Sequence, residues 1–128
     1  MPEEEIVDIL DLIIDSIDLV QKRFTKSSDP EDFISTSDGV TFLDAISMRL
    51  QVIGESVKRI QKKDLSFLNR YAQIEWDKIA RFRDLVSHHY DHVDHEIVYD
   101  ICQNYIPKLR QIIEITIKDL SAVESIPP

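Results

Sequence analysis

LDAISMRLQVIGESVKRI, residues 43–60, decides the fold class of this chain. Its apolar residues recur at alternating spacings of three and four positions, at Leu43, Ile46, Leu50, Ile53, Val57 and Ile60. This spacing places them along one side of an α-helix and is typical of helices that pack in a bundle. We therefore predict a helix over about Val40–Lys62, on which Gly54 lets a neighbouring element approach closely.

Helical periodicity also precedes this segment, and no stretch of the chain alternates as a strand would. The first helix is predicted over about Pro2–Thr25, with an apolar stripe at Ile6, Leu10, Ile13, Ile17, Val20 and Phe24. Between the two helices, Asp29 is expected to cap a short segment that starts at Pro30.

A third helix is predicted over about Glu75–Tyr90, with Ile79, Phe82 and Val86 buried. A less regular connection precedes it, in which Phe67, Leu68 and Tyr71 are expected to pack.

The stretch DHVD, residues 91–94, ends that helix, and Asp94 is expected to cap the last one, over about His95–Val123. Pro107 should kink the last helix, because its ring excludes the carbonyl four residues earlier. Short connections between long amphipathic helices favour an all-α, antiparallel up-and-down bundle of four to five helices. We expect residues 1–128 to form a single domain.

Composition narrows the possible functions. The net charge of −9 disfavours a generic nucleic-acid binder, yet nine of the fifteen Lys and Arg residues fall in residues 49–83. The single cysteine, Cys102, excludes an internal disulfide and is expected to be buried. No apolar run approaches the ~18 residues of a membrane span, so we expect a soluble, cytoplasmic protein without a membrane partner.

All four histidines lie within RFRDLVSHHYDHVDHE, residues 81–96. One interpretation is a metal site, because His88, His92 and His95 share a face if the helix is continuous; the helix break at DHVD speaks against it. A second interpretation is that the histidines simply lie at a helix end and interact favourably with the helix dipole, which accounts for His89 and His92. It does not account for Arg83 and Tyr90, which are predicted to share a face with inward-looking apolar residues.

The third interpretation is acid–base chemistry on a phosphodiester. Histidine, with a pKa near ~6.5, can exchange a proton at neutral pH, and arginine can hold a phosphate. Arg83 and His88, however, lie ~140° apart around a regular helix. Either the helix end distorts after Ser87, or two copies of the chain meet across a two-fold axis and share a site. Asp84, four residues before His88, could hydrogen-bond its imidazole.

The stretch Arg83 to Tyr90, RDLVSHHY, matches the pattern R-x4-H-x-Y and resembles HEPN domains, specifically HepT-type toxins. The flanks IEWDKIARFRD, VDHEIVYDI and Tyr-Ile-Pro-Lys-Leu also fit, whereas many members place asparagine at the position of Asp84.

The resemblance implies a homodimeric ribonuclease toxin that needs no metal or other cofactor. Arg83 and His88 would be catalytic, and Asp84 and His89 supporting. A minimal nucleotidyltransferase (MNT) antitoxin would be the partner, attaching AMP to Tyr90. The alternative is a non-catalytic helical module that binds nucleotides or serves a nucleotidyltransferase.

Overall fold

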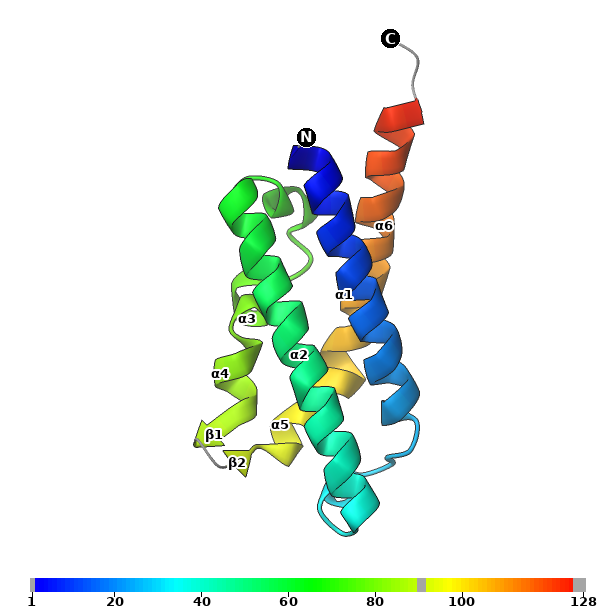
Figure 1. Cartoon of the computed structure of the whole chain (residues 1–128), viewed down its shortest axis with the longest axis vertical. Coiled ribbons are helices and arrows are strands. Elements are labelled where there is room, and N and C mark those ends of the chain that lie inside the picture. Colours follow the sequence, from blue (N-terminus) through cyan, green and yellow to red (C-terminus); the bar gives the residue numbers. More distant parts are fainter. Residues whose placement is uncertain (1, 90–91, 126–128) are drawn as a thin grey trace.

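The computed structural model describes the backbone of residues 2–89 and 92–125, and the side chains of residues 4–87 and 93–122. Two long antiparallel helices, α1 (Pro2–Phe24) and α2 (Ser37–Lys63), form its central pair (Figure 1). The predicted stripes of both helices are buried, except that Phe24 is partly exposed and packs on the core. The α1–α2 pair is therefore held together by burial of two regular apolar faces.

The connection between α1 and α2 is fixed by two side-chain caps. The Asp29 carboxylate accepts a hydrogen bond from the Glu31 N–H at 2.9 Å, which starts the 3₁₀ turn η1 (Pro30–Phe33) as predicted. The Thr36 hydroxyl accepts from the Gly39 N–H at 2.9 Å, so α2 begins a few residues earlier than periodicity indicated.

The segment between α2 and the next helix contains a second 3₁₀ turn, η2 (Leu68–Tyr71). Phe67 and Leu68 are buried and Tyr71 is partly buried, as predicted. The Trp76 indole donates to the Tyr71 carbonyl oxygen at 2.9 Å, and the Tyr71 hydroxyl donates to Asp119 at 2.9 Å. The first bond ties the connection to the start of the next helix, and the second ties it to the last helix.

The predicted third helix is broken. It consists of α3 (Trp76–Ala80) and α4 (Phe82–Val86), separated at Arg81, whose ψ of 17° departs from helical geometry. Ile79, Phe82 and Val86 are buried as predicted, but the extension to Tyr90 is wrong, because helical geometry ends at Val86.

Gly54 of α2 lies against this break. A Cβ atom at Gly54 would be 2.9 Å from the Ile79 carbonyl oxygen and 3.4 Å from that of Ala80. The close approach predicted at Gly54 is thus confirmed, and the element that approaches is the end of α3.

The last helix is assembled from three pieces: α5 (His95–Asp100), the π-helical turn η3 (Ile101–Tyr105) and α6 (Ile106–Ser125). In the π turn, the Ile106 N–H donates to the Ile101 carbonyl five residues earlier. Pro107 follows at once and has no N–H to donate, so the turn widens where the kink was predicted.

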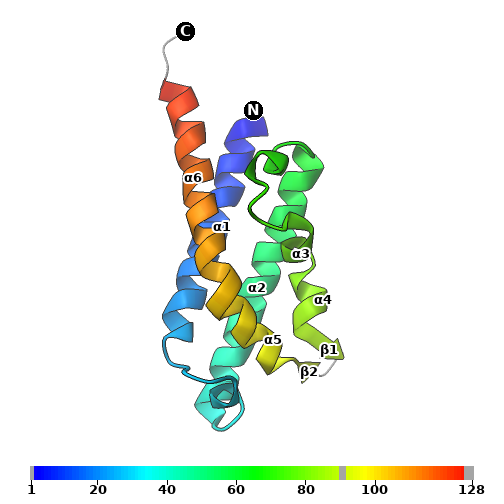
Figure 2. The same ribbon diagram turned by 180° about the vertical axis from the view of Figure 1, so that it is seen from behind.

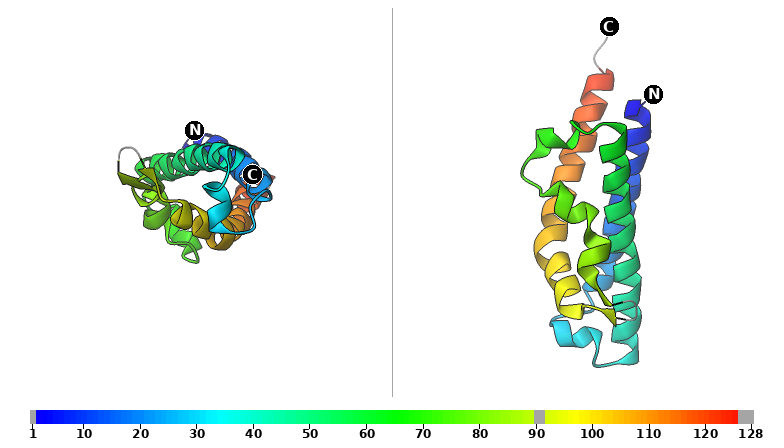
Figure 3. Two further views of the ribbon diagram at one scale, coloured as in Figure 1. Left: turned by 90° about the horizontal axis from the view of Figure 1, so that it is seen from below. Right: turned by 90° about the vertical axis from the view of Figure 1, so that its left-hand side faces the viewer.

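The fold is an all-α antiparallel bundle, as predicted, and its helices surround a common apolar core (Figure 3). Cys102 of the π turn is part of that core, and burial raises the pKa of its thiol to about 12. Within residues 2–89 and 92–125, no helix is long and apolar enough to cross a membrane.

Candidate functional site

The candidate residues lie at the corner between α4 and α5, at the end of the bundle where α2 begins (Figure 1). Here two very short strands, β1 (Ser87–His89) and β2 (His92–Val93), pair antiparallel. Ser87 pairs with Val93 and His89 with His92. We refer to residues 81–96 as the corner.

A change of backbone conformation at Ser87 creates the corner. Its φ of −98° and ψ of 112° are extended, directly after the last residue of α4. The Asp94 N–H then donates to the Val86 carbonyl oxygen at 2.8 Å, which closes the reversal of the chain. Arg83 and His88 therefore do not share a regular helix, and the ~140° separation expected on one does not apply. Of the two geometries considered, the distorted helix end is present within a single chain.

Arg83 is exposed, which corrects the expectation that it shares a face with the buried Trp76, Ile79 and Val86. The break at Arg81 makes the difference, since α4 buries Phe82 and Val86 against the core and turns Arg83 outward. Among the residues that the structure describes, no hydrogen bond or ion pair holds its guanidinium.

The helical contact expected between Asp84 and His88 has no helix to support it. An i, i+4 contact needs a full helical turn, and α4 ends at Val86, before His88 is reached. Asp84 is exposed. The predictions about the side chains of His88 and His89, and about Tyr90 as a whole, fall outside the described residues.

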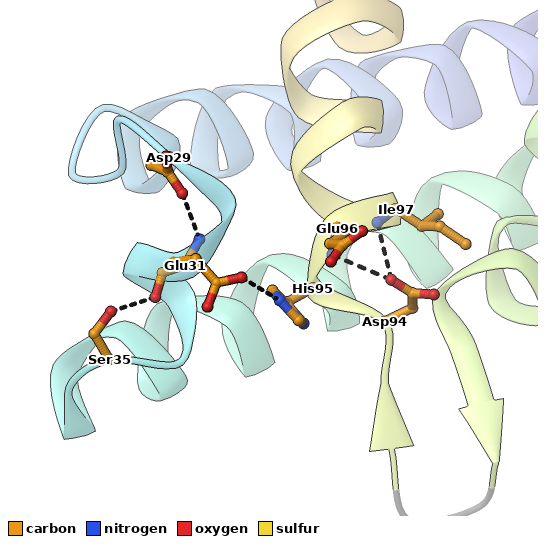
Figure 4. Close-up of polar contacts among 7 residues, drawn as sticks. All are labelled: Asp29, Glu31, Ser35, Asp94, His95, Glu96 and Ile97. Atoms are coloured by element: carbon orange, nitrogen blue, oxygen red, sulfur yellow. Dashed lines mark hydrogen bonds and ion pairs between the residues drawn. The ribbon is translucent and has the colours of Figure 1, made fainter.

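The continuous helix required for a three-histidine metal site is absent, because the described backbone at His88, His89 and His92 is extended. His95 instead begins α5 and is half-buried. Its Nε2 lies 3.3 Å from the Glu31 carboxylate of η1, a residue 64 positions earlier (Figure 4).

Glu96 completes a group of three potential metal ligands with Glu31 and His95, whose ligand atoms lie within 4.8 Å of one another. Both carboxylates are exposed, and Glu96 lies in the first turn of α5, where a helix dipole favours negative charge. The same turn is capped by Asp94, which accepts from the Glu96 and Ile97 N–H groups at 3.1 Å each, as predicted. The contact between His95 and Glu31 thus joins η1 to α5. Spacing along the sequence could not indicate it.

The fold and the corner together define a class of protein. It is an all-α bundle with a solvent-exposed arginine, Arg83, five residues before a histidine, His88, and the chain changes direction between the two. The family model described as Ribonuclease HepT-like matches residues 13–115. The chain belongs to the HepT-like ribonuclease family. The family recognised from Arg83, His88 and Tyr90 is thereby confirmed.

Individual relatives agree with this assignment. "Putative RNase MJ0127" of Methanocaldococcus jannaschii is 34% identical over 124 residues, which cover 94% of this chain and 93% of the relative. "Putative RNase MJ0125" of the same organism is 33% identical over 120 residues, covering 94% and 97%. "Probable ribonuclease HepT" of Thermococcus cleftensis is 32% identical over 103 residues, covering 80% and 87%. No solved structure matches the chain significantly.

Proposed function

We propose that this protein is a metal-independent RNA endonuclease and the toxin of a toxin–antitoxin pair, acting in the cytoplasm as a single HEPN-like domain over residues 1–128. The observation that carries the proposal is the exposed guanidinium of Arg83, five residues before His88, in a chain of the HepT-like ribonuclease family. An outward arginine without a carboxylate partner among the described residues is suited to holding a phosphodiester.

The reaction uses the RNA's own nucleophile. The 2′-hydroxyl oxygen forms a bond to phosphorus while the bond from phosphorus to the 5′-oxygen breaks, leaving a 2′,3′-cyclic phosphate and a 5′-hydroxyl. His88 accepts the proton of the 2′-hydroxyl or donates one to the departing 5′-oxygen. Arg83 stabilises the negative charge that develops on the phosphoryl oxygens.

A homodimer would let Arg83 and His88 of different copies act on one phosphate. A two-fold axis at the corner would bring Arg83 of one copy together with His88 of the other. Mixing Arg83→Ala with His88→Ala subunits tests this: recovery of activity supports a shared site, and no recovery after demonstrated subunit exchange argues against it.

A minimal nucleotidyltransferase (MNT) antitoxin would neutralise the enzyme by attaching AMP to Tyr90. Tyr90 follows His89 directly, so the added nucleotide would bring bulk and negative charge to the corner. RNA phosphate and the attached AMP would compete for the same basic groups. Modified protein should therefore lose both RNA binding and cleavage.

The test of the proposed function is an RNA cleavage assay in excess EDTA with protein purified without a tag. Wild-type protein is expected to cleave RNA to products with 5′-hydroxyl ends, and Arg83→Ala or His88→Ala to reduce the rate at least 100-fold. Arg81→Ala and His95→Asn, which remove the same groups elsewhere in the corner, serve as controls and should keep most of the activity. Full cleavage by both Arg83→Ala and His88→Ala would contradict the proposal.

A further inference from the structure

A polar cleft lies outside the corner, between α3 and the π turn. Its polar lining residues come from two stretches that are distant in the sequence, 73–78 and 104–108, and are Gln73, Glu75, Lys78, Asn104, Tyr105 and Lys108. The buried side chains of Ile74 and Ile79 also line it. The cleft thus combines an apolar lining with two ammonium groups, two amides, a carboxylate and an aromatic ring.

Lys78 and Tyr105 connect the two sides of this cleft. The Lys78 ammonium donates a hydrogen bond to the Tyr105 hydroxyl and lies 4.2 Å from the centre of its ring. That hydrogen bond raises the pKa of Lys78. An ammonium has three N–H donors, and the bond to Tyr105 occupies one.

The π turn helps to place these groups. One extra residue in η3 widens the helix immediately before Pro107, and π turns of this kind recur at functional sites. Asn104 and Tyr105 end this turn and Lys108 follows it, all on the side that faces α3. Figure 2 shows α3 and this part of the last helix flanking α2 on the same side of the molecule.

The charges in the cleft are mixed. Lys78 and Lys108 contribute two positive charges and Glu75 one negative charge. The nearby Asp100 carboxylate accepts a hydrogen bond from the Asn104 amide at 2.6 Å. Such a set suits a ligand that carries a phosphate for the lysines together with hydroxyl or amino groups that a carboxylate and amides can bind.

We infer that this cleft binds one nucleotide of the RNA strand, with its phosphate on Lys78 and Lys108 and its base against the Tyr105 ring. Base stacking on an aromatic side chain, combined with cations along the backbone, is the general mode of single-strand binding. The role in substrate binding rests on the proposed function, whereas the binding itself can be measured without cleavage.

The cleft and the corner lie along one path. α4 continues from α3 toward β1 and β2 (Figure 1), and five residues separate Lys78 from Arg83. We therefore place the bound nucleotide on the same RNA strand as the scissile phosphate.

The experiment measures binding of a fluorescein-labelled RNA of about 12 nucleotides, within the range that single-strand sites cover. Its riboses are 2′-O-methylated, so it cannot be cleaved. Lys78→Gln and Lys108→Gln should each weaken binding at least threefold and lower the salt dependence by about 0.7 in the log–log slope. Lys118→Gln removes the same charge from an exposed site on α6 and should change neither.

Tyr105 provides a matched pair of variants. Tyr105→Phe keeps the ring and loses the hydroxyl, whereas Tyr105→Ala loses both. If a base stacks on the ring, the alanine variant should bind RNA at least fivefold more weakly and the phenylalanine variant should stay near wild type. Equal loss in both variants would overturn the stacking role. Circular dichroism and thermal melting of each variant show whether it is folded.

Two further results separate the possible outcomes. Free AMP or UMP that binds wild-type protein as tightly as the RNA, with RNA affinity unchanged in Lys78→Gln, would make this a site for free nucleotides and overturn the inference. Normal cleavage in EDTA with unchanged RNA affinity in Lys78→Gln, Lys108→Gln and Tyr105→Ala would also overturn it, and would leave the proposed function intact. RNA binding that these variants weaken, without any cleavage by wild-type protein, would support the cleft and contradict the nuclease.

Discussion

The α1–α2 pair and the corner of residues 81–96 are built in different ways. The pair consists of two long, uninterrupted helices whose buried faces repeat along their length. The corner passes through a break, a five-residue helix, two paired strands and a capped helix start within sixteen residues. The regular pair supplies twelve of the 28 buried apolar side chains that the structure describes, and the irregular segment presents polar groups that the core does not use.

This difference indicates how the molecule divides stability from function. A residue on the α1–α2 seam is surrounded by apolar neighbours, so replacing it should change the free energy of unfolding more than the chemistry. A residue such as Arg83 is exposed, so replacing it should change RNA cleavage more than the free energy of unfolding. The two regions meet beside Gly54, where an added Cβ atom would lie 3.5 Å from the Cβ of Phe82.

The largest stability effect is expected on the seam. Leu50 is fully buried, and Leu50→Ala should lower the free energy of unfolding by about 2–5 kcal/mol, because it leaves a cavity in the core. Met48, two positions away, is 59% exposed. Met48→Ala should change the free energy of unfolding by less than about 0.5 kcal/mol. Urea unfolding measures both, and equal losses in the two variants would contradict the description of the seam.

Gly54→Ala tests the contact between the two regions. In a helix interior this change normally stabilises by about 1 kcal/mol. Here the new methyl group would lie 2.9 Å from the Ile79 carbonyl oxygen, so we expect destabilisation by about 1–3 kcal/mol. RNA cleavage should fall as well, because the end of α3 must shift. Glu55→Ala, at the exposed neighbouring position, is the control, and a stabilised Gly54→Ala protein would contradict the close approach.

The same division explains what could be predicted from the sequence. The seam residues and the caps Asp29 and Asp94 depend on local spacing, and they were predicted correctly. The break at Arg81 and the helix end at Val86 involve contacts between residues that are not neighbours on one helix. Gly54 lies against Ile79, and the Asp94 N–H donates to the Val86 carbonyl oxygen. The apolar periodicity of the sequence continues through both positions, so it indicates neither the break nor the helix end.

For the candidate site, the family pattern identified Arg83 and its neighbours. It could not indicate that Arg83 faces solvent, because that orientation follows from the break. It also could not indicate that His95 meets Glu31 across 64 positions of sequence. The π turn was anticipated only as a kink at Pro107, since its hydrogen-bonding pattern has no simple sequence signature.

Asp94→Ala should have an intermediate effect, confined to the corner. Its carboxylate caps α5 by accepting from the Glu96 and Ile97 N–H groups, and loss of such a cap costs about 1 kcal/mol. Asp94→Asn keeps a capping oxygen and should stay within a few tenths of a kcal/mol of wild type. Thermal melting compares the two variants. If alanine and asparagine destabilise equally, the negative charge at the helix start matters more than the hydrogen bonds.

The smallest stability effect is expected at Arg83, where the effect on cleavage should be greatest. Its side chain is exposed and forms no hydrogen bond or ion pair within the part of the chain that the structure describes. Arg83→Ala should therefore change the free energy of unfolding by less than about 0.5 kcal/mol. Arg110, which pairs with Asp18 and Glu114 and donates to Gln21, gives the contrast: Arg110→Ala should cost more stability and leave cleavage largely intact. If Arg83→Ala were instead as destabilising as a seam variant, its loss of activity would reflect misfolding, and the separation of the two regions would fail.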